Sequence, residues 1–361
     1  VLASVVEIEL RGASTSFRLP NLEMRIASSF SVGDSSHREA YDVLSGVGVP
    51  DGIAYGAFNR SDIIDFGHSR FTTSLLLSDG RVQTRGSDVM GQRGDGSRND
   101  GWVELSAIPI QVESGTHHSC ALLEDGQIEC WGWNPHGELG VGDRVLQYCY
   151  NDNPCTYSPL FVEGIDDAYH LFSTSSYNCA LREGNVVSCW GKNNLGQLGS
   201  TPLAITRFPR DVIGLPADDP VISIVGAADK TCALVESGAV WCWGEQLGRG
   251  ESIGTPVPTP LIGIEGAVQI AIMKDAICVR LRTGSVLCTG GNTCGELGNG
   301  TTEDSLLPVM VHDLTDAFDL SCGDHQCCAT RRSGQTVCWG DNQNLQLGIG
   351  DPAYVDEVSS Y

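Results

Sequence analysis

The sequence predicts an all-β protein folded as a single β-propeller of four-stranded blades. One phrase, HSCALLEDGQIECWGWNPHGELGVGD at 118–143, recurs along the chain at spacings of 46 to 59 residues. Repeats of this length are typical of propellers, solenoids and related arrays. Each copy also holds two short runs with period-two alternation around a glycine-containing turn, which is the pattern of a β-hairpin. We therefore take this hairpin as the unit of the fold.

The copies are aligned on a residue pair that ends in glycine. Four copies keep Trp-Gly at this point, and two have diverged. The six pairs are Arg85-Gly86, Trp131-Gly132, Trp190-Gly191, Trp243-Gly244, Thr289-Gly290 and Trp339-Gly340.

Two further strands are expected between successive hairpins. In 158–173 (SPLFVEGIDDAYHLFS) and 307–322 (LPVMVHDLTDAFDLSC), a proline, a β run, an acidic turn and a second β run recur. Four strands per repeat is the composition of a propeller blade. We expect residues 61–361 to form six clear repeats and residues 1–60 to supply a degenerate N-terminal blade, which gives seven blades. A six-bladed ring with 1–60 as an extension is the alternative.

The repeated phrase resembles the repeat of the regulator of chromosome condensation (RCC1) family of β-propellers. The resemblance rests on the motif HSCAL..DG....CWG.N..GELG.GD and covers 61–350 through six units. Members of that family commonly close as seven-bladed rings, and the founding activity is nucleotide exchange on a small GTPase. The shared motif consists of scaffold glycines, tryptophans and hairpin residues, so the resemblance implies no exchange-active residue in this chain.

Most of the 15 cysteines occur as pairs at one spacing and one phase of the repeat. A three-residue turn that ends in a left-handed glycine places Cys120 directly opposite Cys130, and opposed Cβ atoms are close enough for a bridge. The first repeat has Ser74 and Thr84 at the same two places. We predict structural disulfides, with reduced core thiols or metal ligands as the alternatives. The predicted pairs are Cys120 with Cys130, Cys179 with Cys189, Cys232 with Cys242, Cys278 with Cys288, and Cys328 with Cys338.

An inserted loop, QYCYNDNPCTYSP at 147–159, lies outside this phase and accounts for much of the longest spacing. A bridge between Cys149 and Cys155 closes a small ring that holds tyrosines in a constrained patch near Trp133. Insertions on repeat scaffolds often carry binding function, although such a ring also serves simply to stiffen a long loop. The candidate binding residues are Trp133, Tyr148, Tyr150, Asn151, Asp152 and Tyr157. Cys294, Cys322 and Cys327 remain unassigned.

The composition limits the classes of partner. A net charge of −23 opposes binding to a phosphate backbone or an anionic membrane surface. No run of 18 apolar residues marks a transmembrane span. The chain opens with Val-Leu-Ala-Ser, so we expect a processed or truncated N-terminus. Nucleic acid is therefore not an expected partner.

No catalytic signature stands out. The sequence contains no G-x-S-x-G elbow, Walker motif or H-E-x-x-H motif, and we expect neither enzymatic activity nor a cofactor or metal. Two sequons, at Asn59 and Asn299, are candidate glycosylation sites if the chain passes through a eukaryotic secretory route. Asn299 also belongs to the repeat's own LGNGT loop, where a purely structural role is the stronger interpretation.

Three functional classes follow. The first is a non-catalytic protein-interaction scaffold in an oxidising compartment (secreted, extracellular or lumenal) that binds another protein through a propeller face and inserted loops, alone or as a subunit of a larger assembly. The second is a guanine-nucleotide exchange factor, and the third is a carbohydrate-binding propeller that uses aromatic residues such as Trp102 and Trp133. The cysteine phase and the acidic composition favour the scaffold.

Overall fold

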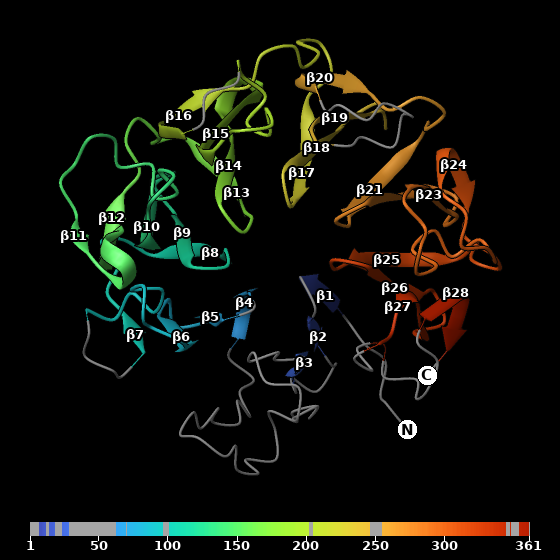
Figure 1. Ribbon diagram of the computed structural model, residues 1–361, viewed down its shortest axis with the longest axis horizontal. Helices are drawn as coiled ribbons and strands as arrows, with labels where there is room; N and C mark the ends of the chain where they lie inside the picture. The colour runs from blue at the N-terminus through green and yellow to red at the C-terminus, as the bar shows by residue number, and fades with distance from the viewer. Residues whose placement is uncertain are drawn as a thin grey trace.

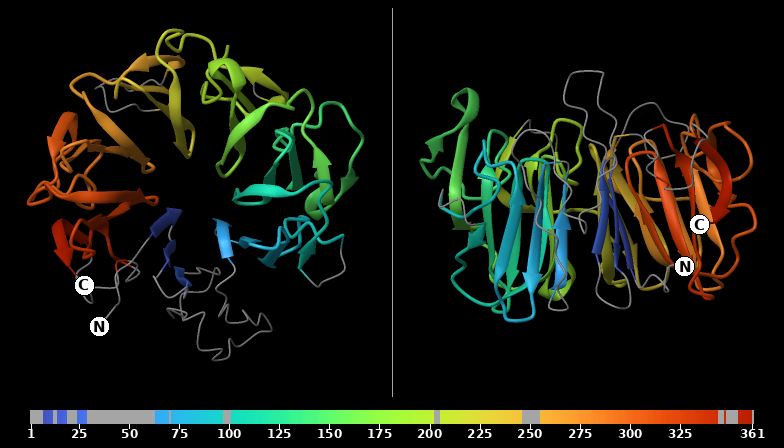
Figure 2. Two further views of the ribbon diagram at one scale, coloured as in Figure 1. Left: turned by 180° about the vertical axis from the view of Figure 1, so that it is seen from behind. Right: turned by 90° about the horizontal axis from the view of Figure 1, so that it is seen from below.

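The computed structural model describes seven β-sheets arranged around a common axis (Figure 1). It describes residues 7–11, 14–18, 24–28, 63–69, 71–96, 101–201, 205–245, 255–343, 347 and 354–360, with the backbone alone for the first three ranges. We number the sheets as blades 1 to 7 in chain order. Seen from the edge, the blades form a thick disc (Figure 2).

The strands of the first three blades differ in number. Blade 1 contains β1 (Glu7–Arg11), β2 (Ser14–Arg18) and β3 (Met24–Ser28). Blade 2 contains β4 (Ile63–His68), β5 (Thr72–Leu77), β6 (Val82–Gly86) and β7 (Trp102–Val103). Blade 3 contains β8 (Pro109–Ser114), β9 (His118–Leu123), β10 (Ile128–Trp133), β11 (Gln147–Tyr148) and β12 (Pro154–Phe161).

Blades 4 to 7 have four strands each. Blade 4 contains β13 (Ala168–Ser173), β14 (Tyr177–Arg182), β15 (Val186–Lys192) and β16 (Ile205–Asp211). Blade 5 contains β17 (Val221–Ala227), β18 (Lys230–Val235), β19 (Val240–Gly244) and β20 (Thr255–Pro260). Blade 6 contains β21 (Ala267–Ile272), β22 (Ala276–Leu281), β23 (Val286–Gly290) and β24 (Ser305–Met310). Blade 7 contains β25 (Ala317–Cys322), β26 (Gln326–Arg331), β27 (Thr336–Asp341) and β28 (Tyr354–Ser360).

The predicted all-β propeller is therefore confirmed, with two departures from four strands per blade. Blade 3 has five strands because the inserted loop adds β11 to its outer edge. Blade 1 has three described strands, and β1 packs beside β25 and β26, so the N-terminal sheet closes the ring against blade 7. Short 3-10 turns occur at η1 (Tyr150–Asp152) and η2 (Glu183–Asn185). Among the described residues, no helix has the length and hydropathy required to span a bilayer.

The hairpin of each repeat forms the second and third strands of a blade. In blade 3, Cys120 pairs directly with Cys130 across β9 and β10, and Gly126 in the intervening turn has φ +80°. Gly132, which follows the repeat tryptophan of this blade, has φ +103°, and a Cβ there would lie 2.6 Å from the carbonyl oxygen of His117. Glycine ends the phrase because the chain passes so close to the neighbouring strand.

In four blades the repeat tryptophan forms a hydrogen bond to the preceding blade. The indole Nε1 of Trp190 in blade 4 donates a 2.9 Å hydrogen bond to the carbonyl oxygen of Glu138 in the GELG segment of blade 3. Three other repeat tryptophans, all fully buried, make the same bond: Trp131 to Gln92, Trp243 to Gln197 and Trp339 to Glu296. These tryptophans are therefore packing residues of the scaffold.

Candidate functional site

The inserted loop forms a raised segment on the outer edge of blade 3. A disulfide joins Cys149 to Cys155, and the backbone N–H of Cys149 donates a 2.9 Å hydrogen bond to the carbonyl oxygen of Asn153. Asn151 and Asp152 at the tip have φ values of +56° and +55°. Tight local bonding of this kind fixes the loop before any partner arrives. Figure 2 shows the segment projecting beyond one rim of the disc.

The loop presents two of its three tyrosines to solvent. Tyr148 is 72% exposed and Tyr150 is 53% exposed. Tyr157, which is half-buried, lines a groove of about 400 Å³ beneath the loop. The remaining wall of this groove is formed by Gly96, Arg144, Val145, Leu146, Gln147, Cys155, Thr156, Ser158 and Leu160.

Trp133, the other predicted member of this patch, contacts a different set of rings. Its ring centroid lies 6.0 Å from that of His117, which in turn stacks on Phe71 of blade 2 at 5.0 Å. Trp133 is half-buried by these neighbours. Trp102, considered for sugar binding, carries the guanidinium of Arg81 at 4.3 Å from its ring centroid. The structure therefore places Trp133 beside the inserted loop, because Trp133 of β10 pairs directly with Cys155 of β12, whereas Trp102 lies in blade 2.

A second surface was not found from the sequence: a ring of apolar side chains on one face of the disc. The innermost strand of each of blades 2 to 7 has a β-bulge at its second residue, where the register with the next strand shifts by one. Every bulge residue is apolar or aromatic, and five of the six are 49% to 61% exposed. We call the set the axial ring; it comprises Ile64, Ile110, Tyr169, Ile222, Val268 and Phe318.

The axial ring and the inserted loop lie on opposite faces. Strands β8 and β10 both pair antiparallel with β9, so they run in the same direction. Ile110 stands near the start of β8, whereas the insertion follows the end of β10. Because all blades repeat these strand directions, the six bulges share the face that also carries the hairpin turns.

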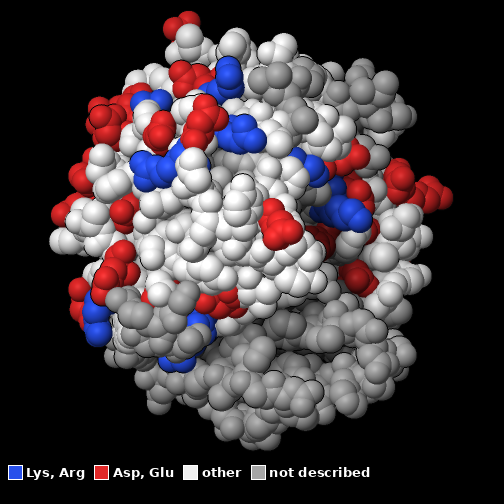
Figure 3. All heavy atoms as spheres, turned by 60° about the vertical axis from the view of Figure 1, so that its left-hand side comes forward, with Lys and Arg blue, Asp and Glu red and all other residues white. Residues whose placement is uncertain are grey.

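Charge around the axial ring is mainly acidic. The turns on that face carry exposed carboxylates at Glu124, Asp125, Asp166, Asp218, Glu236 and Glu265, together with an Asp79–Arg81 ion pair and the exposed Arg282 and Arg332. On the flank of the molecule in Figure 3, separate acidic and basic groups surround a broad uncharged area. A cationic partner would be attracted to the face of the axial ring.

The structure joins all six predicted cysteine pairs as disulfides. The inserted loop is closed by its own bridge, as described above. In the five hairpin bridges the Cα atoms are 4.0 to 4.1 Å apart, as expected for residues that stand directly opposite each other in neighbouring strands. These bridges join Cys120 to Cys130, Cys179 to Cys189, Cys232 to Cys242, Cys278 to Cys288, and Cys328 to Cys338.

The three cysteines left unassigned by the sequence fall into two groups. Cys322 and Cys327 form a further bridge across β25 and β26. Cys294 is the free cysteine, and burial beside Glu296 raises the pKa of its thiol. The described residues hold one sulfur cluster of metal-ligating type, Cys278, Cys322 and Cys327, and all three sulfurs are in disulfides.

The strongly shifted titratable groups make inter-blade contacts. Burial lowers the pKa of Lys230 to about 8, and its ammonium group donates to the carbonyl oxygen of Lys274 in blade 6. Burial also lowers the pKa of His118, whose Nε2 lies 2.8 Å from the side-chain oxygen of Asn178 in blade 4. Desolvation between the blades therefore lowers both pKa values, and for His118 the contact with Asn178 acts against this shift.

Of the two sequons, one lies within the described residues. The side-chain oxygen of Asn299 accepts hydrogen bonds from the backbone N–H and the hydroxyl of Thr301, at 3.2 and 3.0 Å. The Asn299 amide is therefore part of its own turn. Asn59 lies outside the described residues.

Comparison with known proteins agrees with this geometry. The profile of the regulator of chromosome condensation (RCC1) repeat matches residues 110–138, 187–234 and 283–330. The E3 ubiquitin-protein ligase HERC2 of Mus musculus is 27% identical over 328 residues, which is 87% of this chain and 7% of HERC2. The chain thus spans a small part of that relative's length.

Solved structures share the fold at lower identity. Human WBSCR16 aligns with a TM-score of 0.73 and 21% identity over 84% of this chain and 83% of its own. Prp20p from Saccharomyces cerevisiae, studied with its binding to Gsp1p and histones, aligns with a TM-score of 0.68 and 18% identity over 82% of this chain and 76% of its own. The chain therefore carries RCC1 repeats and folds as an RCC1-like β-propeller.

Proposed function

We propose that this protein is a non-catalytic interaction scaffold that binds a partner protein through the face of the axial ring. The observation that carries the proposal is an apolar or aromatic residue at the same bulge in six successive blades, exposed in five of them. Exposed apolar groups concentrated on one surface are a common sign of an interaction site. Bulges re-aim side chains, so a repeated bulge presents all six around one axis.

Burial of the axial ring by a partner would contribute a large part of the free energy of binding. Full burial of an isoleucine or phenylalanine side chain is worth about 1.5 to 3 kcal/mol, so a half-exposed one gains about 1 kcal/mol when covered. Acidic turns such as Glu124-Asp125 border the ring. A partner with an apolar segment flanked by lysine or arginine would match both features.

The inserted loop is proposed as a second contact on the opposite face. Its support is the solvent exposure of Tyr148 and Tyr150 on a loop held by a disulfide. Two separate surfaces suit a subunit that connects neighbours in a larger assembly. We place this activity in an oxidising compartment (secreted, extracellular or lumenal), supported by seven disulfides and a single free cysteine among the described residues.

Affinity capture from the native source tests the two surfaces separately. One variant carries Ile64→Ser, Ile110→Ser and Ile222→Ser in the axial ring, and another carries Tyr148→Ser and Tyr150→Ser. A matched control carries Leu306→Ser and Leu307→Ser, exposed apolar residues of β24 outside the ring.

We expect the axial-ring variant to lose a partner that the wild type and the β24 control both retain. Mass spectrometry of the captured proteins identifies that partner, and near-native circular dichroism shows that the variants fold. Capture that is equal for the ring variant and the control would refute the proposal. Loss of a different protein by the tyrosine variant would support the second contact.

A further inference from the structure

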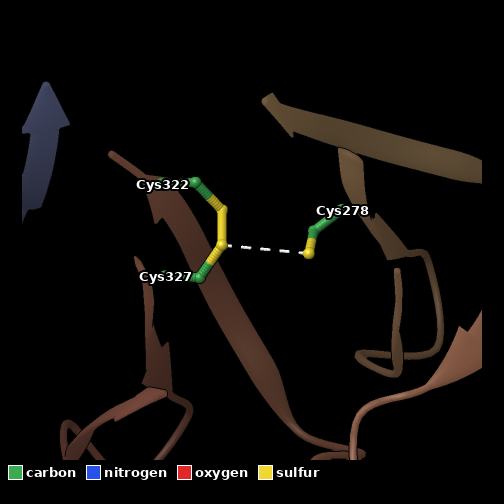
Figure 4. A group of neighbouring side chains, drawn as sticks. All are labelled: Cys278, Cys322 and Cys327. Atoms are coloured by element: carbon green, nitrogen blue, oxygen red, sulfur yellow. Dashed lines mark hydrogen bonds between the residues drawn. A yellow bond between two sulfur atoms is a disulfide. The ribbon is translucent and has the colours of Figure 1, made fainter. Parts of the chain in front are cut away.

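Three cysteines and a methionine meet at the interface between blades 6 and 7. Cys322 and Cys327 come from neighbouring strands of blade 7, and Cys278 faces them from β22 of blade 6 (Figure 4). The Sγ atoms of Cys327 and Cys278 are 3.8 Å apart, and the Sδ of Met273 lies 3.5 Å from Cys327. Two disulfides, each closed within one blade, therefore stand in contact across a blade boundary.

The same three positions exist at the other interfaces and hold different chemistry. Between blades 2 and 3 they are Ser74, Ser114 and Ser119, whose hydroxyls lie 2.9 to 3.5 Å apart in a hydrogen-bonded cluster. At the remaining interfaces the sets are Cys120, Ser173 and Asn178, then Cys179, Gly226 and Thr231, then Cys232, Ile272 and Ile277. Over the described interfaces of blades 2 to 7, three sulfurs occur together only between blades 6 and 7.

The three cysteines of this cluster differ in their exposure to solvent. Cys322 is 8% exposed, whereas Cys327 and Cys278 are 0% exposed. Thiol–disulfide exchange requires a thiolate to reach one sulfur of the bridge, and the sulfur it does not attack leaves as the thiolate. Attack from solvent therefore falls on Cys322, and the leaving thiolate is Cys327, the sulfur that touches Cys278.

We propose that the interface between blades 6 and 7 is a thiol–disulfide exchange site at which a small thiol transfers a bridge from within blade 7 to a position between the blades. First, a low-molecular-weight thiolate such as glutathione bonds to Cys322 Sγ, and the Cys322–Cys327 bond breaks. The Cys327 thiolate then bonds to Cys278 Sγ, and the Cys278–Cys288 bond breaks.

Atoms and electrons balance in these two steps. One thiol enters and remains on Cys322 as a mixed disulfide, and the Cys288 thiolate takes a proton from water. The protein now carries an inter-blade Cys278–Cys327 bridge, and no net oxidation or reduction has occurred. A disulfide bond of about 2.0 Å requires the two sulfurs to approach by about 1.8 Å, which rotation of the Cys327 side chain supplies once its bridge to Cys322 has opened.

The new bridge would replace a disulfide within blade 6 by a disulfide between blades 6 and 7. It closes a sequence separation of 49 residues, compared with 10 for the hairpin bridge that it replaces. It also joins blade 7, which packs against β1 at the ring closure, covalently to its other neighbour. The exchange thus joins blades 6 and 7 covalently, at the boundary next to the ring closure between blades 7 and 1.

Disulfide mapping of the folded full chain tests the proposal. The protein, with Cys294→Ser to remove its free thiol, is equilibrated in a mixture of reduced and oxidised glutathione, quenched in acid, alkylated and digested without reduction. We expect mass spectrometry to detect glutathione on Cys322, a Cys278–Cys327 peptide pair and alkylated Cys288. An intact Cys278–Cys288 pair together with alkylated Cys327, or a Cys322 that stays bridged, would overturn the proposal.

A variant isolates the second step. Cys322→Ser leaves Cys327 as a thiol beside Cys278, and serine already occupies this position in blades 3 and 4 as Ser114 and Ser173. With catalytic glutathione we expect loss of the Cys278–Cys288 pair and gain of Cys278–Cys327.

The matched control is Cys149→Ser, which leaves a thiol at Cys155, far from the cluster on β12. In this control every hairpin bridge should remain and Cys155 should be alkylated. A Cys322→Ser protein that is folded by tryptophan fluorescence but behaves like this control would refute the exchange.

Discussion

Replacing one hairpin disulfide with the hydroxyl pair of blade 2 should measure what the bridge contributes. The change is Cys179→Ser with Cys189→Thr, which copies Ser74 and Thr84. The bridge closes a sequence separation of 10 residues, and the loop-entropy relation gives about 2.7 kcal/mol for a loop of that length. We therefore expect the free energy of unfolding to fall by about that amount while the fold is retained.

The assay is equilibrium unfolding in guanidinium chloride, followed by tryptophan fluorescence and by far-ultraviolet circular dichroism. Coincident transitions from the two probes justify a single free energy. Cys294→Ser serves as the control, because this cysteine forms no disulfide and its replacement should leave the midpoint unchanged. A loss below about 0.5 kcal/mol in the double variant, within the range of ordinary surface substitutions, would refute the assignment of a stabilising bridge.

Three further predictions concern the contacts between blades and strands. The free energy of unfolding of the wild type should rise by about 3 kcal/mol between pH 8 and 10.5, because the unfolded chain still binds the proton that folded Lys230 has released. Lys230→Met should abolish this pH dependence, which urea titrations at several pH values check. Trp190→Phe should cost about 1 kcal/mol by removing the hydrogen bond to Glu138, measured as a lower denaturation midpoint without loss of the propeller's circular dichroism. Gly132→Ala should cost about 2 kcal/mol because its Cβ meets the His117 carbonyl at a positive φ, and a thermal midpoint equal to the wild type would contradict this.

The hairpins were predictable because their signals are local. The spacing of Cys120 and Cys130 around a glycine turn defines a register within one strand pair, and the same spacing recurs in five repeats. The Cys322–Cys327 bridge was missed because it joins the first and second strands of a blade. Their connection carries no periodic cysteine in the other repeats, so nothing in the sequence indicated which residues of β25 and β26 stand opposite each other.

The axial ring was missed for a different reason. A residue such as Tyr169 or Phe318 follows a buried alanine, and this pair looks like ordinary strand alternation. The bulge that turns it outward depends on the pairing of the strand with its neighbour, which is a tertiary property. The signal was nevertheless present, since each repeat places an apolar pair directly before Asp, Gln, His or Ser.

The indole hydrogen bonds of the repeat tryptophans all run from one blade to the preceding blade, and blade 6 lacks this bond. Each indole reaches back to the preceding blade, but blade 6 has Thr289 at that position, and the Thr289 hydroxyl donates to Ser305 within its own blade. Its boundary with blade 5 has no indole bond and relies on apolar packing that includes Ile264, Ile272 and Ile277, together with the hydrogen bond from Lys230 to the carbonyl oxygen of Lys274. Under mechanical load or heating, blades 6 and 7 would therefore separate as one sector from blade 5, and hydrogen exchange should rise first along this boundary.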